Sequence, residues 1–490
     1  MSENLLKIFI SYPPLESKKG IPLLAQNRQF QFSHSPWTAY PIVPALAATL
    51  LKQAGFEVFW DDAINEGLDF EQWEKRILSE NPDIIVMETK TPVVKKHWKI
   101  INGLKIKNYK LKIVLMGDHV TALPLESFEN SRVDYILTGG DYDFLLLNLA
   151  NHLTKGESLE PGWWFRAGNK IETTGKFVLN HNLDSLPFID RNLTHWQQYA
   201  YKNSNFSRVP GTFTMAGRDC WWRRQGGCSF CSWTTIFPQW RVVKPEKLLD
   251  EISQLINLGI KEVFDDSGTF PVGQWLQVFC QGMIDRGYNK KIRLGCNMRP
   301  NAILDQETYN LMGKAGFRFI LYGLESANQK TLDKLNKGEK EGDIGQAVAM
   351  AKKAGLYPHV TCMVGYPWET KKEAQKTIDL AHQLFKDGLI DSLQATIIIP
   401  YPGTTLFKEA EESGWLKTKD WDRYDMREPI LKTELSDQEI LGMVRQLYQT
   451  VLTPKFVFRK IKQVLTNPGH LSYNLRLALK FFSKLRDFGS

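Results

Sequence analysis

Three of the six cysteines in this 490-residue chain fall within twelve positions, at Cys220, Cys228 and Cys231. In a chain without signs of secretion, thiols at such short spacing are more typical of metal ligands than of disulfides. A closed structural zinc site or an ordinary iron–sulfur cluster takes four protein ligands. Three clustered cysteines therefore predict a metal centre with one coordination position open to a small molecule.

Two metal centres are consistent with these cysteines. A four-iron cluster held by three thiolates leaves one iron free to chelate an amine and a carboxylate, and Phe230, next to Cys231, would supply an aromatic wall beside it. A zinc ion would instead take a fourth ligand from elsewhere, with Cys280, Cys296 and Cys362 as the candidates. The cysteines alone leave both interpretations open.

The cysteines follow the first of six expected strands in the second half of the chain. Short β-like runs alternate there with amphipathic helical stretches, among them residues 369–386. The expected strands are Thr212–Met215, Glu262–Phe264, Ile292–Gly295, Phe317–Tyr322, Tyr357–Val364 and Leu393–Ile399. Six βα units predict a partial (β/α)6 barrel, open on one side, with its chemistry at the carboxyl ends of the strands.

Polar, glycine-rich and proline-rich segments stand at the carboxyl ends of the later strands, at 264–268, 297–299, 322–326, 365–370 and 400–404. With the cysteine loop, they make this half resemble the radical S-adenosylmethionine (radical SAM) enzymes. The resemblance implies a [4Fe-4S] cluster on Cys220, Cys228 and Cys231. It also implies S-adenosylmethionine contacts from Phe230, Asp265, Asp266, Arg299, Glu325, Ser326, Gly365 and Pro400.

Within this set, the resemblance places Asp265 and Asp266 near the methionine amine, Glu325 and Ser326 at the ribose, and Gly365 and Pro400 near adenine. Arg299 would pair with the methionine carboxylate or form a surface ion pair. Each acid is equally explained as a loop charge or a helix cap.

The cysteine loop departs from the usual family spacing of three and then two residues. Seven residues, 221–227, separate Cys220 from Cys228, and no cysteine occupies position 224. An insertion within the loop is therefore expected. Its side chains Trp221, Trp222, Arg223 and Arg224 either project toward a substrate or pack and solvate the longer loop.

The first half of the chain shows a second βα alternation. Its expected strands are Lys7–Ser11, Glu57–Trp60, Asp83–Glu88, Lys112–Met116 and Asp134–Leu137, and an amphipathic stretch at 43–54 ends before Gly55. Strands rich in Val and Ile predict a doubly wound parallel sheet covered on both faces. In such sheets ligands bind beyond the carboxyl ends of the strands.

The loops at those ends resemble the cobalamin-binding domain that precedes the radical core in B12-dependent radical SAM enzymes. The Gly-x-His-x-Thr-x-x-Pro run at 117–124 is the most specific part of the likeness. The implied contacts are Pro13, Pro14, Leu15, Thr89, Thr91, Gly117, Asp118, His119, Thr121, Gly139, Gly140 and Asp141. The Asp-x-His-x-x-Gly motif of other cobalamin proteins is absent, so the resemblance implies cobalamin held without a protein histidine. In any single loop Gly and Pro are better explained as turn formers, and it is the presence of four such loops at one edge that favours a ligand-binding face.

The expected organisation is a flavodoxin-like cobalamin-binding domain at 1–154, a connector at 155–205, a radical SAM core at 206–410 and a helical basic region at 411–490. Of the net charge of +8, the tail from 451 to 490 contributes +7, from eight basic residues and one acidic residue. A basic face for nucleic acid is therefore not expected. The tail either touches an acidic membrane surface or caps a core. The N-terminus lacks signal-peptide features and no apolar run is long enough to span a bilayer, which predicts a cytoplasmic protein.

The resemblance implies a cobalamin-dependent radical SAM enzyme, a C-methyltransferase that uses a 5′-deoxyadenosyl radical and methylcobalamin to methylate an unactivated carbon. Its expected partners are a small-molecule or lipid-like substrate and an electron donor such as flavodoxin or ferredoxin. An oxidative cyclase with the same cofactors is the first alternative. An RNA-modifying methylthiotransferase would need a second set of cysteines, and none precedes Cys220. A non-enzymatic cobalamin- or metal-binding protein is the remaining alternative.

Overall fold

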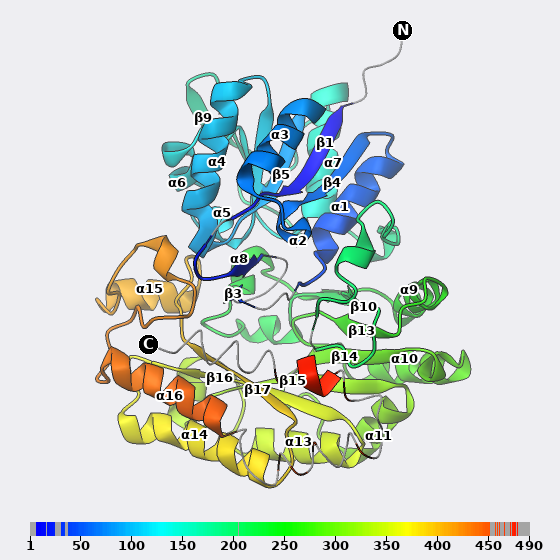
Figure 1. Cartoon of the computed structure of the whole chain (residues 1–490), viewed down its shortest axis with the longest axis vertical. Helices are drawn as coiled ribbons and strands as arrows, with labels where there is room; N and C mark the ends of the chain where they lie inside the picture. Colours follow the sequence, from blue (N-terminus) through cyan, green and yellow to red (C-terminus); the bar gives the residue numbers. More distant parts are fainter. Residues whose placement is uncertain are drawn as a thin grey trace.

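Two sheets, one from each half of the chain, dominate the computed structural model (Figure 1). It describes residues 6–450, except 16, 25–30, 35–37 and 204, together with residues 456, 458, 460, 465, 471, 473–476 and 478. The first sheet lies above the second in Figure 1, and the hairpin of β2 (Ile21–Leu23) and β3 (Gln31–Ser33) lies at the junction between them. The site is built at this junction.

The N-terminal sheet has seven strands in the order β4–β1–β5–β6–β7–β8–β9. Five are parallel: β1 (Lys7–Tyr12), β4 (Glu57–Asp62), β5 (Ile84–Glu88), β6 (Lys112–Met116) and β7 (Tyr135–Leu137). These confirm the five expected strands and the doubly wound order. Every residue of β5 is buried, as expected for an inner strand with helices on both faces.

Four long helices cover this sheet: α1 (Ile42–Gln53), α3 (Phe70–Glu80), α4 (Val94–Lys107) and α7 (Tyr142–Lys155). The short helices α2 (Ala63–Glu66), α5 (Asp118–Ala122) and α6 (Pro124–Asn130) follow strand ends. α1 ends where expected, because Gly55 takes a left-handed φ of 92° that a helix cannot continue. α3 begins with a capping box between Asp69 and Gln72.

The expected connector starts as part of the N-terminal sheet. β8 (Trp163–Ala167) pairs antiparallel with β7, and β9 (Lys170–Thr173) pairs antiparallel with β8. Trp163 is fully buried and anchors this extension. The expected domain boundaries stay a prediction.

The second sheet has six parallel strands in sequence order. They are β10 (Gly211–Thr214), β13 (Glu262–Asp265), β14 (Arg293–Met298), β15 (Phe317–Glu325), β16 (Tyr357–Val364) and β17 (Ser392–Ile397). All six expected strands are present. Among the described residues β10 does not pair with β17, so the sheet is open between its edges.

Helices surround this sheet on the side away from the N-terminal half (Figure 1). They are α9 (Pro245–Asn257), α10 (Gln274–Asp285), α11 (Gln306–Lys314), α13 (Asp343–Lys353), α14 (Lys371–Lys386) and α16 (Asp437–Gln449). α14 begins two residues later than the expected stretch because Thr370 is its N-cap, in a capping box with Glu373. Further short helices are α8 (Trp233–Ile236), α12 (Gln329–Lys334) and α15 (Thr405–Glu412).

Within the described residues, no helix combines the length and the apolar character needed to cross a bilayer. Most of the basic tail, and with it the expected membrane contact, lies outside the described residues. Of the residues described there, Tyr473 is buried, and Arg318 donates to its hydroxyl at 3.4 Å. This part of the tail packs on the second sheet.

Candidate active site

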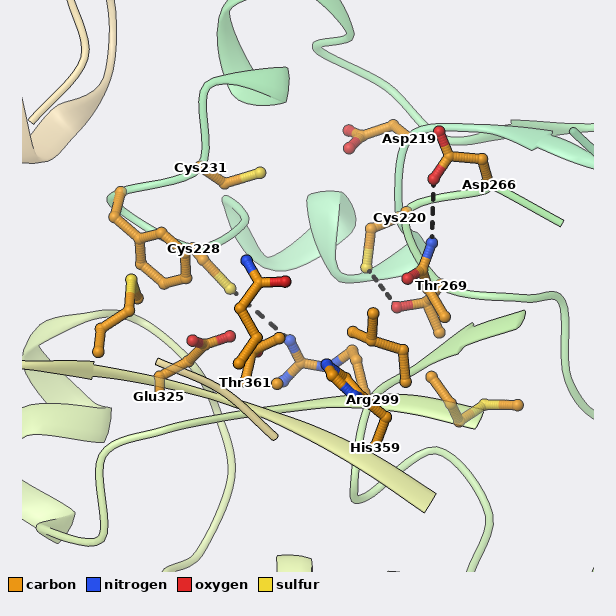
Figure 2. A pocket seen from close by; sticks show the side chains of 18 of the residues that line it. Asp219, Cys220, Cys228, Cys231, Asp266, Thr269, Arg299, Glu325, His359 and Thr361 are labelled. Carbon is orange, nitrogen blue, oxygen red and sulfur yellow. Dashed lines mark hydrogen bonds between the residues drawn. The ribbon is translucent and has the colours of Figure 1, made fainter. Parts of the chain in front are cut away.

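A cavity of about 220 Å³ lies at the carboxyl ends of the second sheet. Its walls come from the cysteine loop, the ends of β13 to β17, the β2–β3 hairpin and the 203–206 segment. Cys220, Cys228 and Cys231 all line it (Figure 2). The structure therefore brings the three cysteines to one enclosed space between the two halves of the chain.

Backbone turns shape the loop that carries these cysteines. A short strand, β11 (Gly217–Arg218), pairs antiparallel with β12 (Arg241–Val242) and leads into Asp219, whose φ is 79°. The inserted residues form a 3-10 helix (Trp221–Gln225) that ends at Gly226 and Gly227, with φ of 87° and 74°. Two successive left-handed positions favour glycine, and they turn the chain back toward Cys228.

Each of two cysteine sulfurs has a polar neighbour across the cavity. Cys220 Sγ donates to Thr269 Oγ1 at 3.2 Å, and Arg299 Nη1 donates to Cys228 Sγ at 3.7 Å. Burial raises the pKa of Cys228 to about 11, although the nearby charges of Lys337 and Arg299 oppose this. A metal that stabilises the thiolate would reverse that shift.

The cysteines fit an iron–sulfur cluster better than a single zinc ion. Zinc at 2.3 Å from each sulfur requires sulfurs within about 4 Å of one another. In the described part of the chain, no three His, Cys, Asp or Glu side chains gather closely enough to hold one ion. The candidate fourth zinc ligands, Cys280, Cys296 and Cys362, are buried and absent from the described cavity wall. Three thiolates spread around a cavity are a suitable donor set for a cluster with one open iron.

The inserted residues pack against the segment that follows α12. Trp222 Nε1 donates to the carbonyl oxygen of Asn336 at 2.6 Å, and the Asn336 side chain donates to Gln225 O and Gly227 O at 2.9 and 2.7 Å. A Cβ on Gly338, whose φ is 60°, would overlap the Trp222 ring. Of the two interpretations of the insertion, these contacts favour packing, although Trp222 also lines the cavity.

A buried charged wall stands beside Cys228. Arg299 forms an ion pair with Glu339 at 3.1 Å, and its guanidinium lies 4.5 Å above the Trp222 ring. Lys337 lies 3.5 Å from Glu325 and 3.7 Å from Glu339. Burial alone would lower the pKa of Lys337, but Glu339 and Glu325 hold it above its ordinary value. Arg299 is thus in a buried ion pair, not in the surface pair that was one of its two sequence interpretations.

Four of the eight residues implied for S-adenosylmethionine line the cavity, namely Phe230, Asp266, Arg299 and Glu325. The side chain of Asp266 accepts from Asn297 Nδ2 at 3.3 Å, and Glu325 takes a left-handed φ of 59° at the end of β15. These residues come from four different loops and strands, so the fold brings together side chains that are far apart in the sequence. Their role in binding stays a prediction.

The other four implied residues are absent from the described cavity wall. Asp265 accepts from the backbone N–H groups of Ala216 and Ser267 at 2.7 and 3.0 Å, and burial raises its pKa to about 6. It ties β10 to β13 beneath the cysteine loop. Ser326 donates to Glu369 at 2.7 Å, Gly365 faces Ile397 and Ile440, and Pro400 lies between two wall residues, Ile399 and Tyr401.

Sequence reasoning missed several residues of the wall. Thr269, Lys337, Thr361 and Gln394 line the cavity, but they lie outside the motifs or within the strands. Thr361 and Gln394 stand on β16 and β17. The sequence of a strand does not show which of its two faces points toward the cavity until the register of the sheet is known. Lys337 follows a helix, so no strand-end pattern marks it.

Aromatic rings line the deeper part of the cavity. Phe213 and Phe264 stand on β10 and β13, with ring centroids 5.9 Å apart, and Phe206 lies 5.5 Å from Phe213. Nearby, His359 shares a hydrogen bond of 2.8 Å with Ser392 through Nδ1. The charged side chains line the part of the cavity next to the cysteines. The part lined by Phe206, Phe213 and Phe264 is therefore suited to an apolar group of a ligand.

The twelve residues implied for cobalamin lie at the carboxyl edge of the N-terminal sheet, as expected. Eleven are buried and Thr121 is half-buried, and none of these described residues lines the cavity. A Cβ on Gly139 would overlap the Phe177 ring, and one on Gly140 would overlap the Phe237 ring. The chain's own side chains cover these loops, so in this arrangement they do not fit a corrin ring.

His119 is enclosed by protein on all sides and is fully buried. Its Nδ1 lies 3.2 Å from Thr91 Oγ1 and its Nε2 lies 3.0 Å from Glu126, while the Trp421 ring packs 5.4 Å away. Both ring nitrogens are therefore engaged within the protein.

Asp141, also implied for cobalamin, instead joins the two halves of the chain. Arg241 donates to it at 2.8 Å and Arg218 at 3.1 Å, and Arg218 also pairs with the buried Asp143. His181 completes the cluster, with Nδ1 3.1 Å from Asp141. Because Arg218 lies two residues before Cys220, this buried cluster fixes the start of the cysteine loop.

Comparison with known proteins agrees with this architecture. Residues 217–381 match the family model described as the Radical SAM superfamily. An uncharacterized methyltransferase of Pyrococcus horikoshii is 27% identical over 470 residues, covering 94% of this chain and 95% of the relative. The anaerobic magnesium-protoporphyrin IX monomethyl ester cyclase of Cereibacter sphaeroides is 26% identical over 432 residues, covering 85% of this chain and 68% of the relative.

Among solved structures, the radical S-adenosylmethionine methyltransferase TsrM from Kitasatospora setae, solved with cobalamin and a [4Fe-4S] cluster, superposes with a TM-score of 0.66 at 15% identity. The match covers 92% of this chain and 90% of that one. At this identity the likeness shows the fold. The resemblance seen in the sequence motifs is confirmed, both for the core that carries the cysteines and for the two-part architecture.

Proposed function

We propose that this chain, a radical SAM enzyme with the fold of a cobalamin-dependent methyltransferase, methylates an unactivated carbon of a small molecule. The observation that carries the proposal is the convergence of Cys220, Cys228 and Cys231 on one cavity, within the segment that matches the Radical SAM model. The aromatic part of the cavity wall, next to the charged part that contains the cysteines, leaves room for an apolar group of the substrate beside the cluster.

Cys220, Cys228 and Cys231 would hold the cluster, and Asp266 and Glu325, which line the cavity, would accept hydrogen bonds from the amine and ribose of S-adenosylmethionine. When bound, the cluster and S-adenosylmethionine supply a radical that removes hydrogen from carbon, and cobalamin supplies a methyl group. The chain's own residues orient these groups and keep water out. Leu23 and Ala39, from the segment over the second sheet, close the cavity on the N-terminal side.

Support for cobalamin comes from the cobalamin-bound TsrM and from the loop motifs, not from an open site. Phe177 and Phe237 cover the loops that would bind it. Among the described residues, the cavity touches the N-terminal half through Leu23, Ser33 and Ala39. Cobalamin binding at the implied loops would therefore require these aromatic rings to move.

An oxidative cyclase is the second candidate, because the Cereibacter sphaeroides relative is a cyclase matched over 85% of this chain. Both reactions would use the same cluster site. They differ in whether the methyl group of S-adenosylmethionine is consumed.

The test uses anaerobically reconstituted protein with methyl-labelled S-adenosylmethionine, a reductant and cobalamin, without a substrate. A methyltransferase is expected to form S-adenosylhomocysteine in a cobalamin-dependent way, in addition to 5′-deoxyadenosine. Formation of 5′-deoxyadenosine alone would favour the cyclase. Formation of neither would contradict a radical SAM enzyme of either kind.

A further inference from the structure

We propose that the outer face of the inserted loop, residues 221–227, is the surface on which an acidic electron-carrier protein docks to reduce the cluster. The inference rests on the proposed function, because it requires Cys220, Cys228 and Cys231 to hold a cluster that receives an electron. Three observations carry it. The loop is a thin wall between the cysteines and solvent, contacts lead from its surface to a cysteine sulfur, and exposed positive charge gathers on and beside it.

The inserted loop is a thin part of the wall between the cysteines and solvent. Arg224 and Gln225 are exposed, whereas Cys220 and Cys228, at the two ends of the loop, line the cavity. Trp222 lines the cavity too, yet it is only half-buried. One side chain of the loop therefore reaches from the cavity wall toward the outer surface. Because the rate of electron transfer falls steeply with distance, a donor docked on this loop would be well placed to reduce the cluster.

A series of contacts leads from this surface to Cys228. The Trp222 ring centroid lies 4.5 Å from the Arg299 guanidinium, and Arg299 Nη1 lies 3.7 Å from Cys228 Sγ (Figure 2). The Trp221 ring packs edge-on against Trp222, with centroids 5.9 Å apart. Trp222 Nε1 donates to the carbonyl oxygen of Asn336 at 2.6 Å, which fixes the ring in this position. An aromatic ring of the loop, a guanidinium and a cysteine sulfur are therefore in successive contact.

Exposed basic side chains surround the outer face of the loop. We call them the basic patch: Arg224, on the loop, and Lys330, Lys334 and Lys340, on the adjoining segment 329–341. This segment contacts the loop directly, because the Asn336 side chain donates to Gln225 O and Gly227 O. The exposed acids of the same two segments are Asp333 and Glu341, so their exposed residues carry a net charge of +2.

The charge of the basic patch is local and is not cancelled from below. Of the net charge of +8, the tail holds +7, which leaves +1 for residues 1–450. The buried charges behind the loop balance one another, because Arg299 pairs with Glu339 and Lys337 with Glu325. A positive surface of this kind attracts a negatively charged partner and speeds their encounter.

Aromatic side chains border the basic patch. The Lys334 ammonium lies 4.6 Å from the Trp368 ring centroid and 5.7 Å from that of Trp415, and both rings are half-buried. The two rings hold this charge in a defined position. Partly exposed tryptophans beside basic residues are typical of protein interfaces, so the surface favours an acidic protein over a small reductant.

The step that this docking serves is the transfer of one electron. With a flavin carrier, the anionic hydroquinone loses the electron and becomes the neutral semiquinone, and the cluster passes from its oxidised to its reduced state. No bond forms or breaks, and no proton moves.

The experiment measures 5′-deoxyadenosine formation by the anaerobically reconstituted protein with two reductants. One is flavodoxin, an acidic flavin protein, kept reduced by its reductase. The other is photoreduced deazariboflavin, a small uncharged reductant that needs no docking surface. The variant Arg224→Glu/Lys334→Glu/Lys340→Glu should lower the rate at limiting flavodoxin about tenfold or more at low ionic strength. That difference should shrink at about 0.5 M salt, which screens exposed charges. The rate with deazariboflavin should be unchanged.

The matched control is Lys110→Glu/Lys155→Glu/Lys170→Glu, which makes the same change of charge at exposed lysines of the N-terminal half and should keep both wild-type rates. Arg224→Glu/Lys340→Glu leaves Lys334 on its tryptophans and should still lower the flavodoxin-dependent rate.

Unchanged flavodoxin-dependent rates in both variants of the basic patch would overturn the inference while leaving the proposed function intact. So would an equal loss in the control variant, or a loss that is the same with the two reductants, because the second would come from a disturbed cluster loop. A wild type that forms 5′-deoxyadenosine with neither reductant would overturn the proposed function itself.

Discussion

Arg299 Nη1 lies 3.7 Å from Cys228 Sγ, and the same guanidinium stacks 4.5 Å above the Trp222 ring of the inserted loop. The insertion therefore contributes to a cationic group that contacts a sulfur of the expected cluster. Hydrogen bonds to cluster sulfurs are among the groups that set cluster potentials. The inserted loop is thus expected to affect the electronic properties of the cluster as well as the shape of the cavity.

Replacing Arg299 with Met should lower the reduction potential of the cluster, because a nearby positive charge and a hydrogen bond both favour the reduced form. Taking about 1.4 kcal/mol for one such contact, the shift is about 60 mV for one electron. A redox titration followed by electron paramagnetic resonance measures it. Arg224→Met, an exposed arginine of the same loop, should leave the potential unchanged. Equal potentials in the wild type and Arg299→Met would show that the contact has no electronic effect.

Gly338→Ala should destabilise the protein by about 1–3 kcal/mol, since its φ is 60° and its Cβ would overlap the Trp222 ring. Thermal unfolding of the apoprotein measures this effect. Gly345→Ala is the control, because this glycine lies in α13 with nothing within 4 Å, and alanine there should be neutral or stabilising by about 0.5–1 kcal/mol. Equal melting temperatures for the two variants would contradict the described docking of the insertion.

His181 should make stability depend on pH. Its hydrogen bond to Asp141 raises its pKa, although burial opposes this and Glu160 adds to it. A raised folded-state pKa gives stability that is complete below the unfolded value of about 6.5 and is lost as the pH rises through the folded value. The stability difference between wild type and His181→Gln should therefore shrink as the pH rises above the unfolded value of about 6.5. A difference that grows with pH would reverse the assigned sign.

Phe177→Ala should strengthen cobalamin binding severalfold if the implied loops are the binding site. In the wild type this ring occupies the space above Gly139 and must move first, which lowers the apparent affinity. Titration of hydroxocobalamin followed by its visible spectrum measures the affinity. Phe165→Ala, on β8 of the same sheet, is the control. Unchanged binding in Phe177→Ala would place cobalamin elsewhere.

Most of the fold followed from the sequence because the expected strands of both sheets are parallel and largely buried. The first four residues of β5, Ile84 to Met87, are a continuous apolar run, and helix boundaries are marked by residues such as Gly55 and Thr370. The two antiparallel strands β8 and β9 were missed, because 163–173 alternates weakly and lies in a segment rich in turn residues. Their place at the sheet edge depends on pairing with β7, which is a tertiary contact.

The site was predictable only where residues stand at strand ends. Cys220, Asp266 and Glu325 meet in the cavity because the carboxyl ends of parallel strands converge. Asp265 and Asp266 are adjacent in sequence, but the alternation of a strand sends the first beneath the loop and the second to the cavity. Lys337 was not predictable, since its position depends on how the insertion packs.

The cobalamin loops show a different limit. Their motifs indicated that these residues lie at the carboxyl edge of the N-terminal sheet. However, the space left by a glycine without a side chain can be filled by an aromatic ring of the protein as well as by a ligand. Phe177 and Phe237 come from segments 38 and 97 residues after Gly139 and Gly140. Contacts at such separation leave no local pattern in the sequence.

The central claim is that Cys220, Cys228 and Cys231 hold a cluster whose open iron binds S-adenosylmethionine. Electron paramagnetic resonance of the reduced, anaerobically reconstituted protein tests it directly. We predict a [4Fe-4S] signal in the wild type that changes when S-adenosylmethionine is added, that is lost in Cys228→Ala, and that remains in Cys280→Ala. A wild-type signal that does not change when S-adenosylmethionine is added would contradict its binding to the open iron. A signal that remains in Cys228→Ala would contradict the role of Cys228 as a cluster ligand.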